Sequence, residues 1–352
     1  MSASAARRRQ DKFYTAQSAV KHTVRMLEAS LDAIGLAPSD CLAVEPSAGG
    51  GAFLARLRQV GFAELRAFDI VPEAEGIEEQ DFLASEIRAD AARRPVVVVG
   101  NPPFGKRAAG AIAFLNHAFA ERASVVAFIL PVQMRKWPSH KAVSAPARLI
   151  LDIDLPPNAF EFEGAPYDVR SCFQVWVGDG MAEHLSDLRI KTRPPVSHPD
   201  FEIWQYNRTR QAEWVFDQDW DFAVLRQGYG DYTVLHERGA ILDRKKQWIL
   251  FRASSAAVRA RLRALDFDAL SRTNTSVRGF GKTEVVAEYC RLHEARQSGA
   301  HVRDAARNLA RIEALADGRR RGGLHHAARP DTRRTQADRR LSDGAQMALS
   351  AD

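Results

Sequence analysis

Residues 42–53 of this chain read LAVEPSAGGGAF, a short apolar run that passes through an acid and a proline into three consecutive glycines. Leu54 and Leu57 follow at helical spacing. Glycines let the backbone turn tightly and approach a ligand closely. A strand, a glycine-rich turn and a helix form the usual cradle for nucleotide-like ligands. This stretch therefore predicts the opening strand and helix of an α/β fold.

Short apolar runs recur through the first half of the chain, separated by stretches long enough for helices. They cover residues 42–44, 65–68, 96–99, 125–130, 149–155 and 171–177. Continuous β-branched runs that alternate with helical stretches indicate a mostly parallel sheet buried on both faces. Residues 18–36 carry apolar side chains at helical spacing, which predicts an amphipathic helix before the first strand.

The pattern changes near Gly180, where proline-rich and aromatic-rich sequence replaces the alternating runs. We predict four parts: an N-terminal segment and helix (1–36), an α/β domain that carries the chemistry (37–180), a smaller accessory region (181–300) and a tail (301–352). The tail is rich in Arg and Ala with hardly an aromatic residue, a composition typical of disorder.

The composition is that of an ordinary globular protein. The 352 residues are 45% hydrophobic and 27% charged, which excludes collagen-like, coiled-coil and wholly disordered classes. A net charge of +6 favours a polyanionic partner, though modestly for this length. No apolar run approaches the ~20 residues of a membrane span, and no signal-like segment opens the chain, so we expect a cytoplasmic protein.

Three cysteines, Cys41, Cys172 and Cys290, lie far apart in the sequence. Their spacing suits neither a disulfide framework nor a zinc site. We therefore expect reduced, structural thiols and no metal, and the oligomeric state stays open.

Asp69 ends the second apolar run, where an acid is placed to accept hydrogen bonds from ribose hydroxyls. The turn at Gly49, Gly50 and Gly51 departs from the G-x-G-x-x-G fingerprint of dinucleotide-binding proteins. A nucleotide-like ligand other than a dinucleotide fits this pattern, and a tight structural turn is the alternative.

A second motif, Asn101-Pro102-Pro103-Phe104-Gly105, follows the four-valine run 96–99 and Gly100. The amino group of adenine is a poor nucleophile because its lone pair is delocalised into the ring, and acceptors on both N–H groups help it to rehybridise. The Asn101 side-chain oxygen and the Pro102 carbonyl are two such acceptors. The prolines stiffen the turn, and Phe104 offers a flat face for the ring. A proline-rich structural loop is the alternative.

At these two motifs the chain resembles the class I S-adenosylmethionine-dependent amino-methyltransferases, especially the N6-adenine methyltransferases with N-P-P-F or N-P-P-Y. The resemblance covers roughly residues 10–178 and implies a Rossmann-like, mostly parallel seven-stranded sheet, with S-adenosylmethionine as the cofactor. It implies a catalytic role for Asn101, Pro102, Pro103 and Phe104. The motif order, with the cofactor turn before N-P-P-F and the extra region after it, resembles the gamma-class DNA adenine methyltransferases.

The resemblance also implies cofactor-binding residues. The methionine half of the cofactor would lie at Glu45, Ser47, Gly49 and Gly51, the ribose at Asp69, the adenine at Asp81 and Phe82, and the methionine carboxylate near Thr15 of Phe13-Tyr14-Thr15. The proline that usually follows this last element is Ala16 here.

Four further residues are candidates on the substrate side. Phe160 and Phe162 follow the run 149–155 and could stack on the far side of a flipped base, with core packing as the alternative. Arg135 and Lys136 follow the run 125–130 beside Trp137 and could contact phosphates, with a solvated face as the alternative.

The predicted function is N6-methylation of adenine in DNA, with the base flipped out of the duplex. RNA adenosine is the second substrate, and a protein glutamine is a third because its carboxamide nitrogen fits the same motif. A nucleic-acid-binding module that has kept the fold without activity is the alternative from another class.

Overall fold

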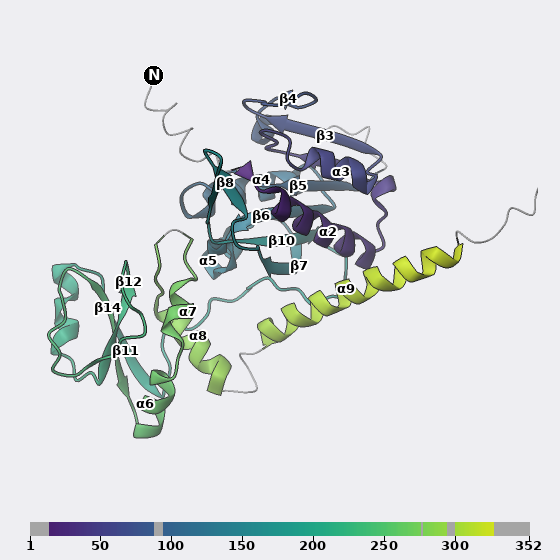
Figure 1. Ribbon diagram of the computed structural model, residues 1–352. Helices are drawn as coiled ribbons and strands as arrows, with labels where there is room; N and C mark the ends of the chain where they lie inside the picture. The colour runs from purple at the N-terminus through teal and green to yellow at the C-terminus, as the bar shows by residue number, and fades with distance from the viewer. Residues whose placement is uncertain (1–13, 88–93, 276, 294–299, 327–352) are drawn as a thin grey trace, which may run out of the picture.

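The computed structural model describes residues 14–87, 94–275, 277–293 and 300–326. Two bodies of secondary structure lie next to each other (Figure 1). The large unit consists of the described residues between 14 and 190 and is built on a seven-stranded sheet. The small unit covers residues 201–293 and is built on a four-stranded sheet.

The seven-stranded sheet forms the centre of the large unit. In chain order its strands are β2 (Leu42–Glu45), β3 (Glu64–Asp69), β4 (Glu78–Glu79), β5 (Val96–Gly100), β6 (Val125–Pro131), β7 (Ala147–Asp154) and β10 (Ser171–Gly178). Across the sheet the order is β4-β3-β2-β5-β6-β10-β7. The order of the first five strands is that of a Rossmann-like α/β fold.

The strand directions confirm the expected α/β sheet in part, because one strand, β10, runs against the other six. Neighbours from β4 to β6 are parallel, but β10 is antiparallel to both β6 and β7. Between β7 and β10 the chain makes only a short hairpin, β8 (Phe160–Phe162) and β9 (Ala165–Tyr167), with no crossover helix. Parallel strands need a crossover of a dozen or more residues, so β10 returns in the opposite direction and the sheet is mixed.

Helices cover both faces of this sheet. They are α2 (Gln17–Ala33), α3 (Leu54–Val60), α4 (Ala109–Ala120) and α5 (Trp137–Ala142), with the short 3₁₀ turns η1 (Pro38–Asp40), η2 (Phe82–Ala84), η4 (Lys106–Ala108) and η5 (Val132–Arg135). Successive side chains of a strand point to opposite faces. Val97 and Val99 of β5 therefore pack in one core with α2, whereas Val96 and Val98 pack in the other with α4.

The small unit has its own hydrophobic core, separate from those of the large unit. Its antiparallel sheet has the order β11-β14-β12-β13. The elements are β11 (Phe201–Tyr206), η6 (Arg210–Asp217), β12 (Phe222–Gln227), β13 (His236–Glu237), β14 (Gln247–Ala253), α6 (Ala256–Arg263), α7 (Phe267–Ser271) and α8 (Lys282–His293).

The C-terminal segment differs from the disordered tail that its composition predicts. Helix α9 (Ala300–His326) returns from the small unit and runs alongside α2 (Figure 1). Ile312 is fully buried in the core of the large unit. Asn308 Nδ2 donates to the carbonyls of Ile150 (3.0 Å) and Ser186 (2.7 Å). Alanine and arginine are good helix formers, and one apolar face suffices to dock the helix. Residues 327–352 lie outside the described residues.

None of the helices within the described ranges combines the length and the apolar character that crossing a bilayer requires. Cys41, Cys172 and Cys290 are all buried, and none of them forms a disulfide within the described residues.

Candidate functional site

The two sequence motifs meet at the carboxyl ends of neighbouring strands. Val44 of β2 is paired with Val98 of β5, so Glu45, the last residue of β2, and Asn101, which follows β5, lie at neighbouring strand ends. From β2 the chain first builds outward to β3 and β4 and then returns to β5 on the other side of β2. The strand order therefore reverses between β2 and β5, and this switch point is where ligands bind in open α/β sheets.

Asn101 is held from two sides by residues of the predicted site. Its Nδ2 donates to Thr15 Oγ1 (3.2 Å), and its backbone carbonyl accepts from Ser47 Oγ (3.1 Å). Its Oδ1 is buried and has no hydrogen-bond partner among the described residues. An unmet buried acceptor costs about 1–3 kcal/mol. Asn101 thus presents a fixed acceptor that a ligand N–H group could satisfy.

The turn after Asn101 is fixed on the N-terminal end of α4. The Phe104 carbonyl accepts from the Gly110 backbone N–H (3.1 Å). A Cβ atom at Gly110 would lie only 2.4 Å from the Pro103 carbonyl oxygen, so this close approach requires glycine. Pro102 is buried and Pro103 is exposed. The diproline turn is consequently a rigid element, as the fixed φ of proline also favours.

Phe104 packs edge-on against Phe160, with ring centroids 6.4 Å apart. Phe160 is only 1% exposed and belongs to the core, and its strand β8 pairs with β1 (Tyr14–Thr15). Its ring has almost no surface left for a base, so the core-packing alternative describes it, and it supports Phe104. Phe162 lies against Tyr167 and is partly exposed, so it remains a candidate for stacking.

The glycine-rich turn is tied to the end of β3 by Asp69. One carboxylate oxygen accepts from the Gly49 N–H (2.7 Å) and the other from the Val71 N–H (2.8 Å). Gly49 and Gly51 have φ of +50° and +77°, conformations that glycine adopts at no steric cost. The carboxylate is thereby oriented and keeps lone pairs free for hydroxyl donors.

Glu45 is a buried carboxyl group, 2% exposed, whose Oε2 has no hydrogen-bond partner in the described residues. Burial raises its pKa well above the usual range, and the negative charge of Asp69 raises it further. Buried carboxylates are normally paired with a cation or neutralised. This arrangement therefore favours a ligand that brings a positive charge to the end of β2.

Tyr14 was not predicted as a site residue, although the sequence singles out its neighbour Thr15. Its hydroxyl donates to Glu73 Oε2 (2.6 Å), and the Glu73 N–H donates to the Gly49 carbonyl (3.1 Å). The Tyr14 ring lies 3.9 Å from where a Cβ of Gly50 would be. Tyr14 and Glu73 therefore line the glycine-rich turn. The Phe13-Tyr14-Thr15 motif was the signal that could have found Tyr14, and Phe13 itself lies outside the described residues.

Asp81 and Phe82 differ in accessibility. Asp81 is exposed, and its Oδ1 accepts from the Leu83 N–H (3.0 Å) at the start of η2. Phe82 is 1% exposed and packs against Phe114 and His117, with centroid distances of 5.3 and 4.9 Å. Phe82 is thus a core residue in this structure, and Asp81 is the member of the pair that a ligand can reach.

Arg135 and Lys136 do not form the free basic cluster that the sequence predicts. Arg135 pairs with Asp152 (2.8 Å) and Asp154 (2.5 Å) at the end of β7. Lys136 pairs with Glu284 of the small unit (2.8 Å) and donates to the Asn274 side chain (2.6 Å). Sequence alone could not show this, because the acids lie far away in the chain. Both cations are engaged within the protein, and their contact with phosphate stays a prediction.

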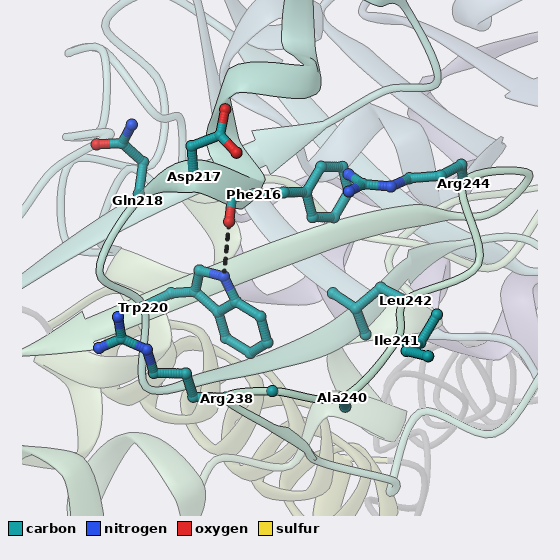
Figure 2. A pocket seen from close by; sticks show the side chains of 10 residues that line it. Phe216, Asp217, Gln218, Trp220, Arg238, Ala240, Ile241, Leu242 and Arg244 are labelled. Carbon is teal, nitrogen blue, oxygen red and sulfur yellow. Dashed lines mark hydrogen bonds between the residues drawn. The ribbon is translucent and has the colours of Figure 1, made fainter.

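A pocket of about 390 Å³ lies in the small unit, away from these motifs (Figure 2). The Arg244 guanidinium lies over the Phe216 ring, and Trp220 Nε1 donates to the Phe216 carbonyl (3.4 Å). None of the sequence-predicted site residues lines it. Within the described ranges, no group of three or more His, Cys, Asp or Glu side chains is arranged to hold a metal ion.

No protein-family model matches this chain, and no curated protein is detectably similar to it in sequence. Among solved structures it is similar to a suspected RNA methyltransferase from Pyrococcus horikoshii (16% identity, 45% of this chain, 83% of that chain, TM-score 0.34). It is also similar to a suspected hemolysin from Lactococcus lactis (14% identity, 48% of this chain, 91% of that chain, TM-score 0.34). A third similar structure is the Type IIL restriction-modification enzyme MmeI in complex with DNA (9% identity, 89% of this chain, 74% of that chain, TM-score 0.40).

These likenesses are too distant to carry a conclusion about function. The fold is an α/β fold, and the two motifs form a candidate ligand site at the switch point of its sheet.

Proposed function

We propose that this chain is an S-adenosylmethionine-dependent methyltransferase that methylates the N6 amino group of adenine in DNA. The carrying observation is that two buried atoms at neighbouring strand ends, Asn101 Oδ1 and Glu45 Oε2, have no hydrogen-bond partner among the described residues. One group suits an amino donor and the other suits a cation. A methyl acceptor and a sulfonium cofactor together meet both requirements.

The residues around the glycine-rich turn fit the cofactor. Glu45 would hold a positive charge, Asp69 would accept from ribose hydroxyls, and the turn at Gly49 and Gly51 lets the backbone come close. Asp81 is open to the adenine end. When bound, S-adenosylmethionine supplies a methyl group on a positively charged sulfur. Ser47 and Thr15 are hydrogen-bonded to Asn101 and so connect this region to it. These contacts would hold the methyl donor and the methyl acceptor in a fixed relative position.

The residues after β5 fit the methyl acceptor. Asn101 Oδ1 and the Pro102 carbonyl would accept from the two N–H groups of the adenine amine, which favours the pyramidal nitrogen that attacks the methyl group. Phe104 would stack on the ring, with Phe160 fixing its position from behind. A rigid turn is advantageous because catalysis gains from acceptors that need no reorganisation.

DNA is our first choice of substrate because of the motif order and the basic net charge. A flipped adenine can enter such a site at a cost of a few kcal/mol, which stacking and edge contacts offset. RNA adenosine is the runner-up, and a protein glutamine a less favoured third.

The test is to incubate the protein with methyl-labelled cofactor and, separately, adenine-containing duplex DNA, RNA and a glutamine-rich peptide. We expect label in DNA, recovered as N6-methyladenine after hydrolysis. Label in RNA alone would reverse the order of substrates. Cofactor binding by calorimetry with no transfer to any of the three would favour a non-catalytic binding module.

A further inference from the structure

Two exposed cations directly follow the diproline turn. Lys106 and Arg107 belong to η4, between Gly105 and the start of α4. In the described part of the chain, neither side chain forms an ion pair or a hydrogen bond. They differ in this from Arg135 and Lys136, which acids neutralise. The free positive charge at this edge of the sheet therefore lies next to the Asn101 turn.

The backbone of η4 adopts a conformation that its side chains do not favour. Arg107 has φ 55° and ψ 34°, and Ala108 has φ 65° and ψ 16°. Glycine and asparagine enter this left-handed region most easily, usually as single residues. Arg107 is exposed, so packing does not explain an arginine here.

The turn before η4 is closely packed. A Cβ atom at Gly105 would lie 2.8 Å from the Gly110 nitrogen, so this position requires glycine. The two charged side chains that follow are exposed to solvent beside the site. Strained residues of this kind gather at functional sites.

We infer that Lys106 and Arg107 bind the backbone phosphates that flank the target adenine. The inference rests on the proposed function. A flipped base stays attached to its own phosphates, so these come to the same face of the protein as the turn, where long side chains beside the turn can reach them. Arginine matches phosphate with its planar fork, and lysine acts as a compact point charge. These contacts are independent of sequence and position the strand, as phosphate contacts usually do.

Arg122 is a matched control for Arg107. It is also an exposed arginine with a left-handed backbone, φ 63°, and its side chain has no hydrogen bond or ion pair within the described residues. It follows the last turn of α4, at the opposite end of the helix from η4. Its left-handed conformation there is an ordinary helix end, where the Ala123 N–H donates to the Ala118 carbonyl.

The experiment measures binding of an adenine-containing DNA duplex by fluorescence anisotropy at several salt concentrations. The variants are the double change Lys106→Gln with Arg107→Gln, and Arg122→Gln. We expect the double variant to bind about tenfold or more weakly, and its log–log salt slope to fall by roughly 1.8, at ~0.9 per lost phosphate contact. Arg122→Gln should bind within about twofold of the wild type, and all variants should bind cofactor equally in calorimetry.

Arg107→Gly separates binding from folding. Glycine suits the left-handed backbone, so this variant should melt no lower than the wild type while binding DNA more weakly. The inference is overturned if the wild type methylates DNA but the double variant keeps its affinity and salt slope, or if the wild type binds no duplex at all. If the wild type binds duplex with the predicted difference between variants but transfers no methyl group, the proposed function fails and the phosphate contacts stand.

Discussion

The sheet of the large unit presents two polar regions along the same edge, and they differ in how their charges are met. At the ends of β2 and β5, Glu45 Oε2 and Asn101 Oδ1 are buried without partners in the described residues. At the ends of β6 and β7, Arg135 meets Asp152, and Gln174 Nε2 donates to the same carboxylate (3.1 Å).

The comparison teaches what distinguishes a ligand site from a structural junction. Both regions have polar residues at strand ends, so residue type and position do not separate them. The difference is whether the protein itself supplies the partners. Two buried polar atoms of the first region have no partner among the described residues, whereas the second region is tied to the small unit through Lys136 and Glu284.

The largest effect is expected for Asn101→Ala. Loss of the fixed acceptor should reduce the single-turnover methyl-transfer rate by at least about 10²–10³-fold, the scale for removing one preorganised hydrogen-bonding group. Cofactor affinity in calorimetry should hardly change, because the contacts at the glycine-rich turn remain. A variant as active as the wild type would refute the role of Asn101.

Glu45→Gln should act on the cofactor instead. Loss of a charged contact is worth about 1.5–3 kcal/mol, so cofactor affinity should fall by roughly 10- to 150-fold. In the wild type, affinity should rise with pH as Glu45 ionises through its raised pKa and then level off, since a bound cation favours the ionised carboxyl. The variant should lose this pH dependence, and equal pH profiles would contradict the assignment.

Glu45→Gln should weaken cofactor binding, but it should raise the free energy of unfolding of the cofactor-free protein. The pKa of Glu45 is raised in the folded state, so its contribution to stability is complete below the unfolded-state pKa and is lost as pH rises through the folded-state pKa. Glu45→Gln should therefore unfold at higher denaturant concentration than the wild type at neutral pH, with the advantage vanishing in acid. Urea titrations at several pH values measure this.

The smallest effect is expected at the junction, for Lys136→Gln. The Lys136 and Glu284 side chains are 19% and 21% exposed, so breaking their pair should cost roughly 1 kcal/mol of unfolding free energy. Burial by itself raises the pKa of Glu284, but Lys136 and hydrogen bonds bring it below its usual value. The cost should therefore persist in mild acid and disappear only when Glu284 is protonated. A double-mutant cycle with Glu284→Gln isolates the pair, and a coupling near zero would mean that other contacts hold the units together.

Much of the fold follows from local pattern. The run of valines before Gly100 predicts β5 because a strand buried on both faces needs no alternation, and α2 matches the helix predicted from its apolar spacing. β4 was missed because it is a two-residue polar edge strand, Glu78–Glu79, with no periodic signal. α9 was not predicted because the apolar face that packs against the large unit is narrow and the composition of the helix resembles that of a disordered segment.

The sequence by itself determined the two motifs and their place after buried apolar runs. A glycine-rich turn after one buried run and Asn101-Pro102 after another are local features, and parallel strands bring their ends to one edge. Only the tertiary structure decided which polar groups find a hydrogen-bond or ion-pair partner within the protein. Arg135 is neutralised by acids 17 and 19 residues away, and Lys136 by one 148 residues away, while Lys106 and Arg107 meet none in the described chain. Partners so remote in sequence are set by packing, because a charge interacts with whatever lies nearby in space.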